Sequence, residues 1–104
     1  MSFHITDRYG SMDGPHDTAR FPFLLRQLDE HPEDTEHGSV SITHESEWCI
    51  SVSRGGVATL EHLEDGGECH MLGLTEPQVI HLWTLLAEGD IASIQQQPWV
   101  PGYP

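Results

Sequence analysis

Apolar and polar residues alternate along the middle of the chain, as they do in half-buried β-strands. Four runs share this strand-like pattern: residues 38–45, 47–53, 57–63 and 68–74. Glycine pairs at 55–56 and 66–67 separate the later runs, and glycine tolerates the positive φ angles of tight hairpin turns. We therefore expect consecutive antiparallel strands in this region, preceded by a short strand within residues 2–9.

Two segments have the three- and four-residue spacing of an amphipathic helix. The first covers residues 18–31, where Pro22 falls near the first turn and either Asp17 or Thr18 can cap the helix. Its apolar face consists of Phe21, Leu24, Leu25 and Leu28. The polar residues 31–38 that follow predict a loop.

The second helical segment covers residues 75–88 and carries a signal at each end. Thr75 and Gln78 form the T-x-x-Q pattern of a capping box, and Gly89 stands where a C-terminal cap glycine is expected. Its main apolar face consists of Val79, Leu82, Trp83 and Leu86. The spacing and the caps together predict a helix that packs one face on the sheet.

The remaining residues predict a short helix and an extended tail. Asp90 can cap a helix over 91–97, and the proline-rich residues 98–104 are expected to pack on the body through Trp99 and Tyr103. The element order β-α-β-β-β-β-α-α indicates one α+β domain over residues 1–104, with a four- to five-stranded antiparallel sheet and helices on one face. The other sheet face is expected to carry small polar residues: Ser39, Ser41, Thr43, Cys49, Ser51, Ser53 and Thr59.

Charge narrows the possible partners. The 104 residues include 17 Asp and Glu and only four basic residues, all Arg, which gives a net charge of −13. Such a chain lacks the clustered Lys and Arg that nucleic acids and anionic membranes require, whereas it attracts basic proteins. No signal peptide or membrane-spanning run is seen, and two cysteines do not form a disulfide scaffold, so we expect a cytoplasmic protein with reduced thiols.

The acidic residues gather in three blocks, at 29–36, 45–47 and 61–68, which fall in predicted loops or at strand ends. Loops on a rigid scaffold often carry binding sites. Trp48 adjoins one block and is a candidate aromatic anchor, although its alternation with Ile50 and Val52 also fits a core residue. The candidate partner-binding residues are Glu33, Asp34, Glu36, Glu45, Glu47, Trp48, Glu61, Glu64, Asp65 and Glu68.

Catalytic and metal-binding patterns are weak. The stretch EHLEDGGECH contains His62, Glu68 and His70, and a hairpin with the two histidines on one face could hold a metal. No paired zinc-ligand spacing, nucleophile elbow, phosphate loop or dinucleotide fingerprint is present. The sequence therefore predicts neither an enzyme nor a cofactor, and a small metal-dependent enzyme is kept as an alternative.

Between Gly38 and Tyr103 the chain resembles a group of small bacterial proteins of unknown biochemistry, through the runs SITHESEWCISV, LEHLEDGG, HMLGL, LWTLLAEGD and PWVPGY. In type it is also similar to the small acidic immunity proteins of bacterial toxin systems, which implies an inhibitor of a basic toxin or nuclease. An acidic protein-binding module is thus the leading hypothesis. A homodimeric structural module, joined through the Ser/Thr sheet face or a sheet edge, is a further alternative.

Overall fold

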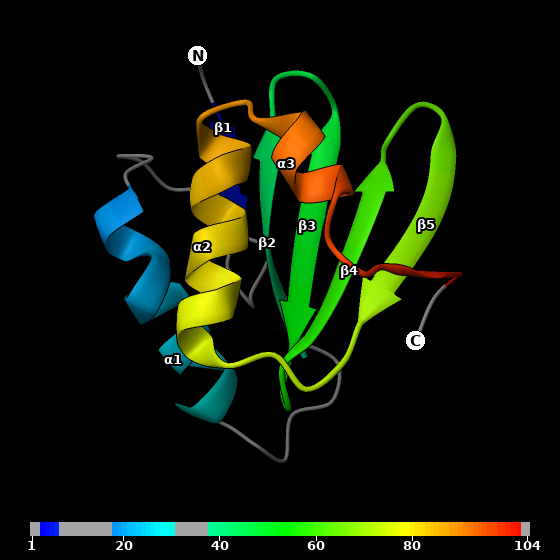
Figure 1. Ribbon diagram of the computed structural model, residues 1–104. Coiled ribbons are helices and arrows are strands. Elements are labelled where there is room, and N and C mark those ends of the chain that lie inside the picture. Colours follow the sequence, from blue (N-terminus) through cyan, green and yellow to red (C-terminus); the bar gives the residue numbers. More distant parts are fainter. Residues whose placement is uncertain (1–2, 7–17, 31–37, 103–104) are drawn as a thin grey trace.

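A computed structural model describes residues 3–6, 18–30 and 38–102 (Figure 1). One antiparallel sheet runs in sequence order through β1 (Phe3–Thr6), β2 (Ser39–His44), β3 (Trp48–Ser53), β4 (Val57–His62), β5 (Gly66–Met71) and β6 (Val100–Pro101). This confirms the α+β class, but the sheet has six strands and not four or five. The additional strand comes from the tail, where Val100 pairs with His70 and Pro101 with Cys69, because the extended proline-rich chain lies along the free edge of β5.

The helices are η1 (Thr18–Arg20), α1 (Phe21–Glu30), α2 (Glu76–Ala87) and α3 (Ile91–Gln95). The predicted capping box of α2 is confirmed, since the Gln78 amide donates to the Thr75 hydroxyl at 3.3 Å and the Thr75 amide donates to the Gln78 side chain at 2.8 Å. Gly89 follows the C-cap with a φ of 76°, as the sequence predicted. None of the described helices is long and apolar enough to cross a membrane.

The three α-helices cover one face of the sheet (Figure 1). The core lies between the two layers, with Trp83 of α2 fully buried at its centre. The Trp83 ring packs edge-on against Phe21, with the ring centroids 5.4 Å apart, and its Nε1 donates to the Ile50 carbonyl at 3.1 Å. These contacts fix α2 on β3. On the other face, the predicted Ser and Thr residues are exposed or half-buried, whereas Cys49 is buried.

The sheet has two distinct ends. The β2–β3 and β4–β5 connections lie at one end, together with the α2–α3 connection (Figure 1). The β3–β4 connection and the start of α2 lie at the opposite end, where the Leu74 amide donates to the Gly56 carbonyl at 3.0 Å. This division separates the charged groups described below.

Candidate functional site

Two hydrogen bonds join the β2–β3 turn to the β4–β5 turn. The Leu63 amide donates to the Glu47 carbonyl at 2.9 Å, and Nε2 of His62 lies 2.9 Å from the Ser46 carbonyl. The join brings together carboxylates that the sequence had placed in two separate blocks. We use the name "acidic end" for the group formed by Glu45, Glu47, Glu64, Asp65 and Glu88.

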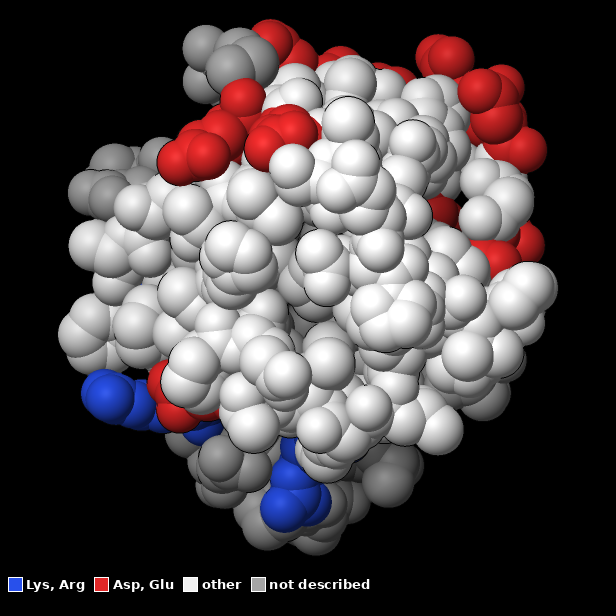
Figure 2. Space-filling view, viewed as in Figure 1, with Lys and Arg blue, Asp and Glu red and all other residues white. Residues whose placement is uncertain are grey.

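Glu88, which exposes its side chain after the last turn of α2, was missed by the sequence analysis. The sequence alone could have indicated its position. Because successive strands alternate in direction, β5 ends at the end of the sheet where α2 begins, opposite the two acidic turns. A 12-residue helix is about 18 Å long, so α2 returns to the end of the sheet that carries those turns. In the space-filling view most acidic atoms lie around the upper part and the right edge, whereas the basic atoms lie at the lower left and the lower edge, beside one further acidic group (Figure 2). The basic atoms visible in this view therefore lie away from the acidic end.

Two histidines hold Ser46, the central residue of the β2–β3 turn. Nδ1 of His44 lies 3.1 Å from the Ser46 amide and 2.8 Å from its hydroxyl, and Nδ1 of His62 lies 3.2 Å from the Asp65 amide. A backbone N–H only donates, so each Nδ1 accepts and each ring carries its proton on Nε2. The Nε2–H of His62 then donates to the Ser46 carbonyl and links the two turns.

Glu47 has a φ of 74°, and no other described non-glycine residue has a positive φ. The Glu47 amide donates to the His44 carbonyl at 2.9 Å, which makes a three-residue hairpin connection that ends in a left-handed residue. Glycine is the usual residue at that position, and a side chain there costs about 1 kcal/mol. The chain thus carries a carboxylate at a position where stability favours glycine.

We expect Glu47→Gly to raise the free energy of unfolding by about 1 kcal/mol, because glycine adopts this φ without strain. A higher midpoint in urea denaturation at constant salt would show it. Glu45→Gly is the matched control: it removes a carboxylate from the same turn at a position that has no positive φ. If Glu47→Gly lowered the midpoint, the side chain would be stabilising the turn and the strain argument would be wrong.

Trp48 is half-buried and packs against the core, as its alternation with Ile50 and Val52 suggested. Its ring meets the His62 ring edge-on, with the centroids 5.1 Å apart. The more exposed apolar side chain at this end is Leu63, at 52% exposure, which the sequence analysis assigned to a strand. Leu63 lines a pocket of about 430 Å³ together with Glu45 and Glu47.

The other candidate residues do not lie in the two turns. Glu61 pairs with Cys49 on the sheet face away from the helices. Glu68 lies two residues before His70 on β5, so the two residues share that same face. Glu33, Asp34 and Glu36 lie outside the described residues.

The register corrects the expectation that His62 and His70 share a sheet face. His62 pairs with Trp48 on the helix-covered face, whereas His70 pairs with Thr59 on the other face. Both ring nitrogens of His62 are engaged within the protein, and Nδ1 of His70 lies 2.8 Å from the Gly102 carbonyl. Within residues 3–6, 18–30 and 38–102, no three His, Cys, Asp or Glu side chains are grouped so as to hold a metal ion.

The two thiols offer little chemistry. Burial raises the pKa of the Cys69 thiol above its ordinary value, and its Sγ lies 3.8 Å from the Leu60 carbonyl. Cys69 therefore stays protonated at neutral pH and is a poor nucleophile. Cys49 is buried beside Ser51, with 3.8 Å between the two side-chain atoms.

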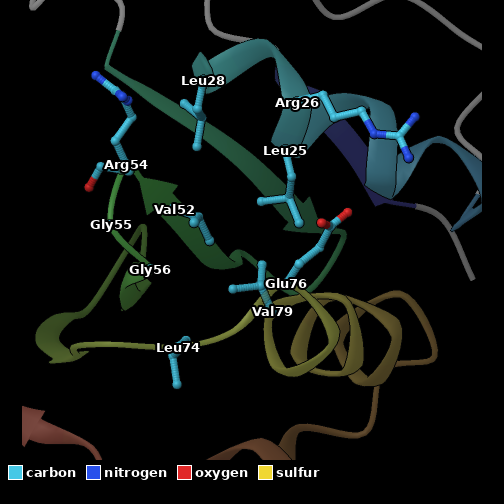
Figure 3. A pocket seen from close by; sticks show the side chains of 11 residues that line it. Leu25, Arg26, Leu28, Val52, Arg54, Gly55, Gly56, Leu74, Glu76 and Val79 are labelled. Carbon is cyan, nitrogen blue, oxygen red and sulfur yellow. The ribbon is translucent and has the colours of Figure 1, made fainter. Parts of the chain in front are cut away.

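A second pocket, of about 150 Å³, lies at the opposite end of the sheet (Figure 3). Val52, Leu25 and Val79 line its apolar part, and Arg54 and Arg26 stand on opposite sides of it. The basic groups at this end are thus kept apart from the acidic end.

Comparison of the chain with protein-family models, with curated proteins and with solved structures gave no match.

Proposed function

We propose that this protein is an acidic protein-binding module whose acidic end occludes a basic surface on a partner, namely the active-site region of a toxin or nuclease. The observation that carries the proposal is the hydrogen-bonded join between the two acidic turns, which presents several carboxylates on one rigid support. Complementary charge of this kind accelerates association and rejects partners of the wrong sign.

Several features agree with such a role. Glu64 and Asp65 are exposed, so guanidinium or ammonium groups can reach their carboxylates. Leu63 adds an exposed apolar group to the pocket that Glu45 and Glu47 also line, and burying an apolar side chain in an interface stabilises the complex. The strain at Glu47 also fits a residue that is retained for binding at a cost in stability.

We expect the double substitution Glu64→Arg and Asp65→Arg to weaken binding of the basic partner by about 100-fold or more, because like charges then meet across the interface. The partner is first isolated at low salt from the native host, and its affinity for each variant is then measured by calorimetry. Both side chains are exposed, that of Asp65 at 85%, so the fold is expected to persist.

Glu76→Arg is the control, since it reverses an exposed acidic residue at the opposite end, where Glu76 lines the smaller pocket together with Gly56 and Leu74. It is expected to leave the affinity within a few-fold of the unmodified protein, because exposed charges farther apart than about 10 Å are largely screened at moderate salt. The double substitution changes the net charge by 4 and Glu76→Arg changes it by 2. If Glu76→Arg lost half as much binding free energy as the double variant, only net charge would matter, and the acidic end would lose its role. If low-salt capture returned no basic protein, the proposal would be abandoned.

A further inference from the structure

We propose that His44 makes the acidic end sensitive to pH: when its ring gains a proton, the β2–β3 turn loses its present conformation and the hold on a basic partner weakens. The effect on partner binding rests on the proposed function, whereas the change in the β2–β3 turn does not. It concerns the only described side chain that combines nearly complete burial with a polar atom lacking a hydrogen-bond partner.

The Nδ1 atom of His44 must accept for the turn to keep its shape. The Ser46 amide points at Nδ1 from 3.1 Å, and the Ser46 hydroxyl lies 2.8 Å from the same atom. A protonated ring carries hydrogen on both nitrogens, so the Ser46 amide then faces a second donor. The hydroxyl can turn to accept, but the amide cannot, and one of the two contacts is lost.

Burial adds to this cost. His44 is only 5% exposed, it pairs with Phe3 across the sheet, and its Nε2 has no hydrogen-bond partner among the described residues. A charged ring in this place has one N–H without a partner and little contact with water, and uncompensated buried charge is expensive. A proton therefore binds to His44 only when the turn opens and lets the ring reach solvent.

His62 behaves differently, although it holds the same turn. Its Nδ1 accepts the Asp65 amide at 3.2 Å, and the Asp65 carboxylate lies 3.6 Å from the same nitrogen. A proton on Nδ1 exchanges the amide contact for an ion pair, while Nε2–H keeps the Ser46 carbonyl. Protonation of His62 is therefore compensated locally, whereas protonation of His44 is not.

The neighbouring charges do not replace the missing partner. Several described elements next to His44 carry ionisable groups: His4 on β1, Glu45 and Glu47 in the turn, Cys49 on β3, His62 and Asp65 in the second hairpin, Arg26, Asp29 and Glu30 on α1, and Glu76, His81 and Glu88 on α2. Glu45 is exposed and Glu47 is half-buried, and neither makes a hydrogen bond to Nε2 of His44. They favour a charged ring once the turn has opened, which strengthens the response.

The expected result is a local change between about pH 8 and about pH 5.5, the range in which histidines generally gain a proton. Asp and Glu side chains keep their charge there, since their ordinary pKa values are about 4. Nitrogen NMR of the ring reports the protonation state of His44, and amide NMR reports hydrogen exchange. The amides of Glu47 and Leu63 should then lose hydrogen-exchange protection at least about 10-fold more than the Leu74 amide, which is bonded at the opposite end.

The variant His44→Asn provides the test of cause, because its amide oxygen can accept from Ser46 and does not titrate. We expect it to abolish the selective change at Glu47 and Leu63. His81→Asn, which removes an exposed histidine from α2, is expected to leave the change intact. If His44 stays neutral down to about pH 5.5 while the fold persists, or if Leu74 loses protection in parallel with Leu63, the proposal is overturned, whatever happens with the variant.

A basic probe connects the change to binding. Affinity for a nona-arginine peptide at low salt is expected to fall about 10-fold more in the unmodified protein than in His44→Asn between the same two pH values. The chain has eight histidines, and histidines that gain a proton make the net charge less negative. This general effect is shared by the unmodified protein, His44→Asn and His81→Asn. A selective NMR change without any peptide affinity would remove the proposed function but not the switch. Equal pH dependence of peptide affinity in all three proteins would overturn the switch in binding.

Discussion

Gly56→Ala is expected to lower the free energy of unfolding by about 3 kcal/mol, a large share of the 5–15 kcal/mol typical of a small domain. Two effects add at this position. The backbone has a φ of 74°, which costs an alanine about 1 kcal/mol or more. A Cβ atom there also meets backbone atoms of Leu74, with the carbonyl oxygen at 2.2 Å and the amide nitrogen at 2.7 Å.

The clash cannot be relieved by a side-chain rotation, because both close atoms of Leu74 belong to the backbone. Gly56 accepts the Leu74 amide at 3.0 Å, so this approach joins the β3–β4 turn to the segment that leads into α2 (Figure 3). Moving Leu74 away breaks that hydrogen bond and displaces the start of α2. Urea denaturation followed by circular dichroism at constant salt measures the loss.

Gly55→Ala is the matched control for this prediction. Gly55 also has a positive φ, of 85°, but a Cβ atom placed on it meets nothing within 4 Å. Its substitution is expected to cost only the conformational part, about 1 kcal/mol. Similar midpoints for the two variants would mean that Leu74 moves aside at little cost, and the close approach would not matter for stability.

The sequence predicted these turns, but not which glycine is indispensable. Gly-Gly at 55–56 indicates a hairpin because both residues tolerate positive φ, and that property is the same for the two positions. The difference arises from Leu74, which lies 18 residues away and approaches only one of them. Local chemistry therefore defines the turn, and a long-range contact decides the cost of changing it.

The same distinction explains what the sequence could say of the candidate site. Alternation and glycine pairs placed Glu64 and Asp65 in a connection between strands, as observed. They placed Glu45 and Glu47 at the ends of the strand-like runs 38–45 and 47–53, whereas both residues lie in the β2–β3 turn. The direction of successive strands also implies that the two connections share one end of the sheet. The hydrogen bond that joins the two connections, from His62 to the Ser46 carbonyl, depends on the tautomer and position of the His62 ring. Neither can be predicted from the spacing of residues in the sequence.

The sixth strand and the position of Glu47 show two further limits. Residues 98–104 are predicted to be extended, and Val100–Pro101 form a strand, but pairing with β5 needs the free edge that β5 offers only in the folded sheet. Glu47 has an ordinary sequence context, and a glutamate gives no local signal for a positive φ. In both cases the whole fold imposes a conformation that local preference does not specify.

Trp83→Phe is expected to lower the free energy of unfolding by about 3 kcal/mol, because it removes a buried hydrogen bond and leaves space in the core. Trp83 is fully buried, its Nε1 donates to the Ile50 carbonyl at 3.1 Å, and its ring contacts Phe21. The bond connects the middle of α2 to the middle of β3, so it also determines where the C-terminal end of α2 presents Glu88. Loss of this connection is expected to weaken the packing of the helix layer on the sheet.

Trp99→Phe makes the same chemical change at a less buried position. Nε1 of Trp99 donates to the Ile94 carbonyl at 2.8 Å, but its ring is only half-buried against the core, so we expect a loss of about 1 kcal/mol. Urea denaturation monitored by circular dichroism compares the two variants without depending on tryptophan fluorescence. If both lost the same stability, the hydrogen bond would account for the whole effect and the packing of Trp83 would contribute nothing. A larger loss for Trp83→Phe assigns the difference to the contacts that hold α2 on the sheet.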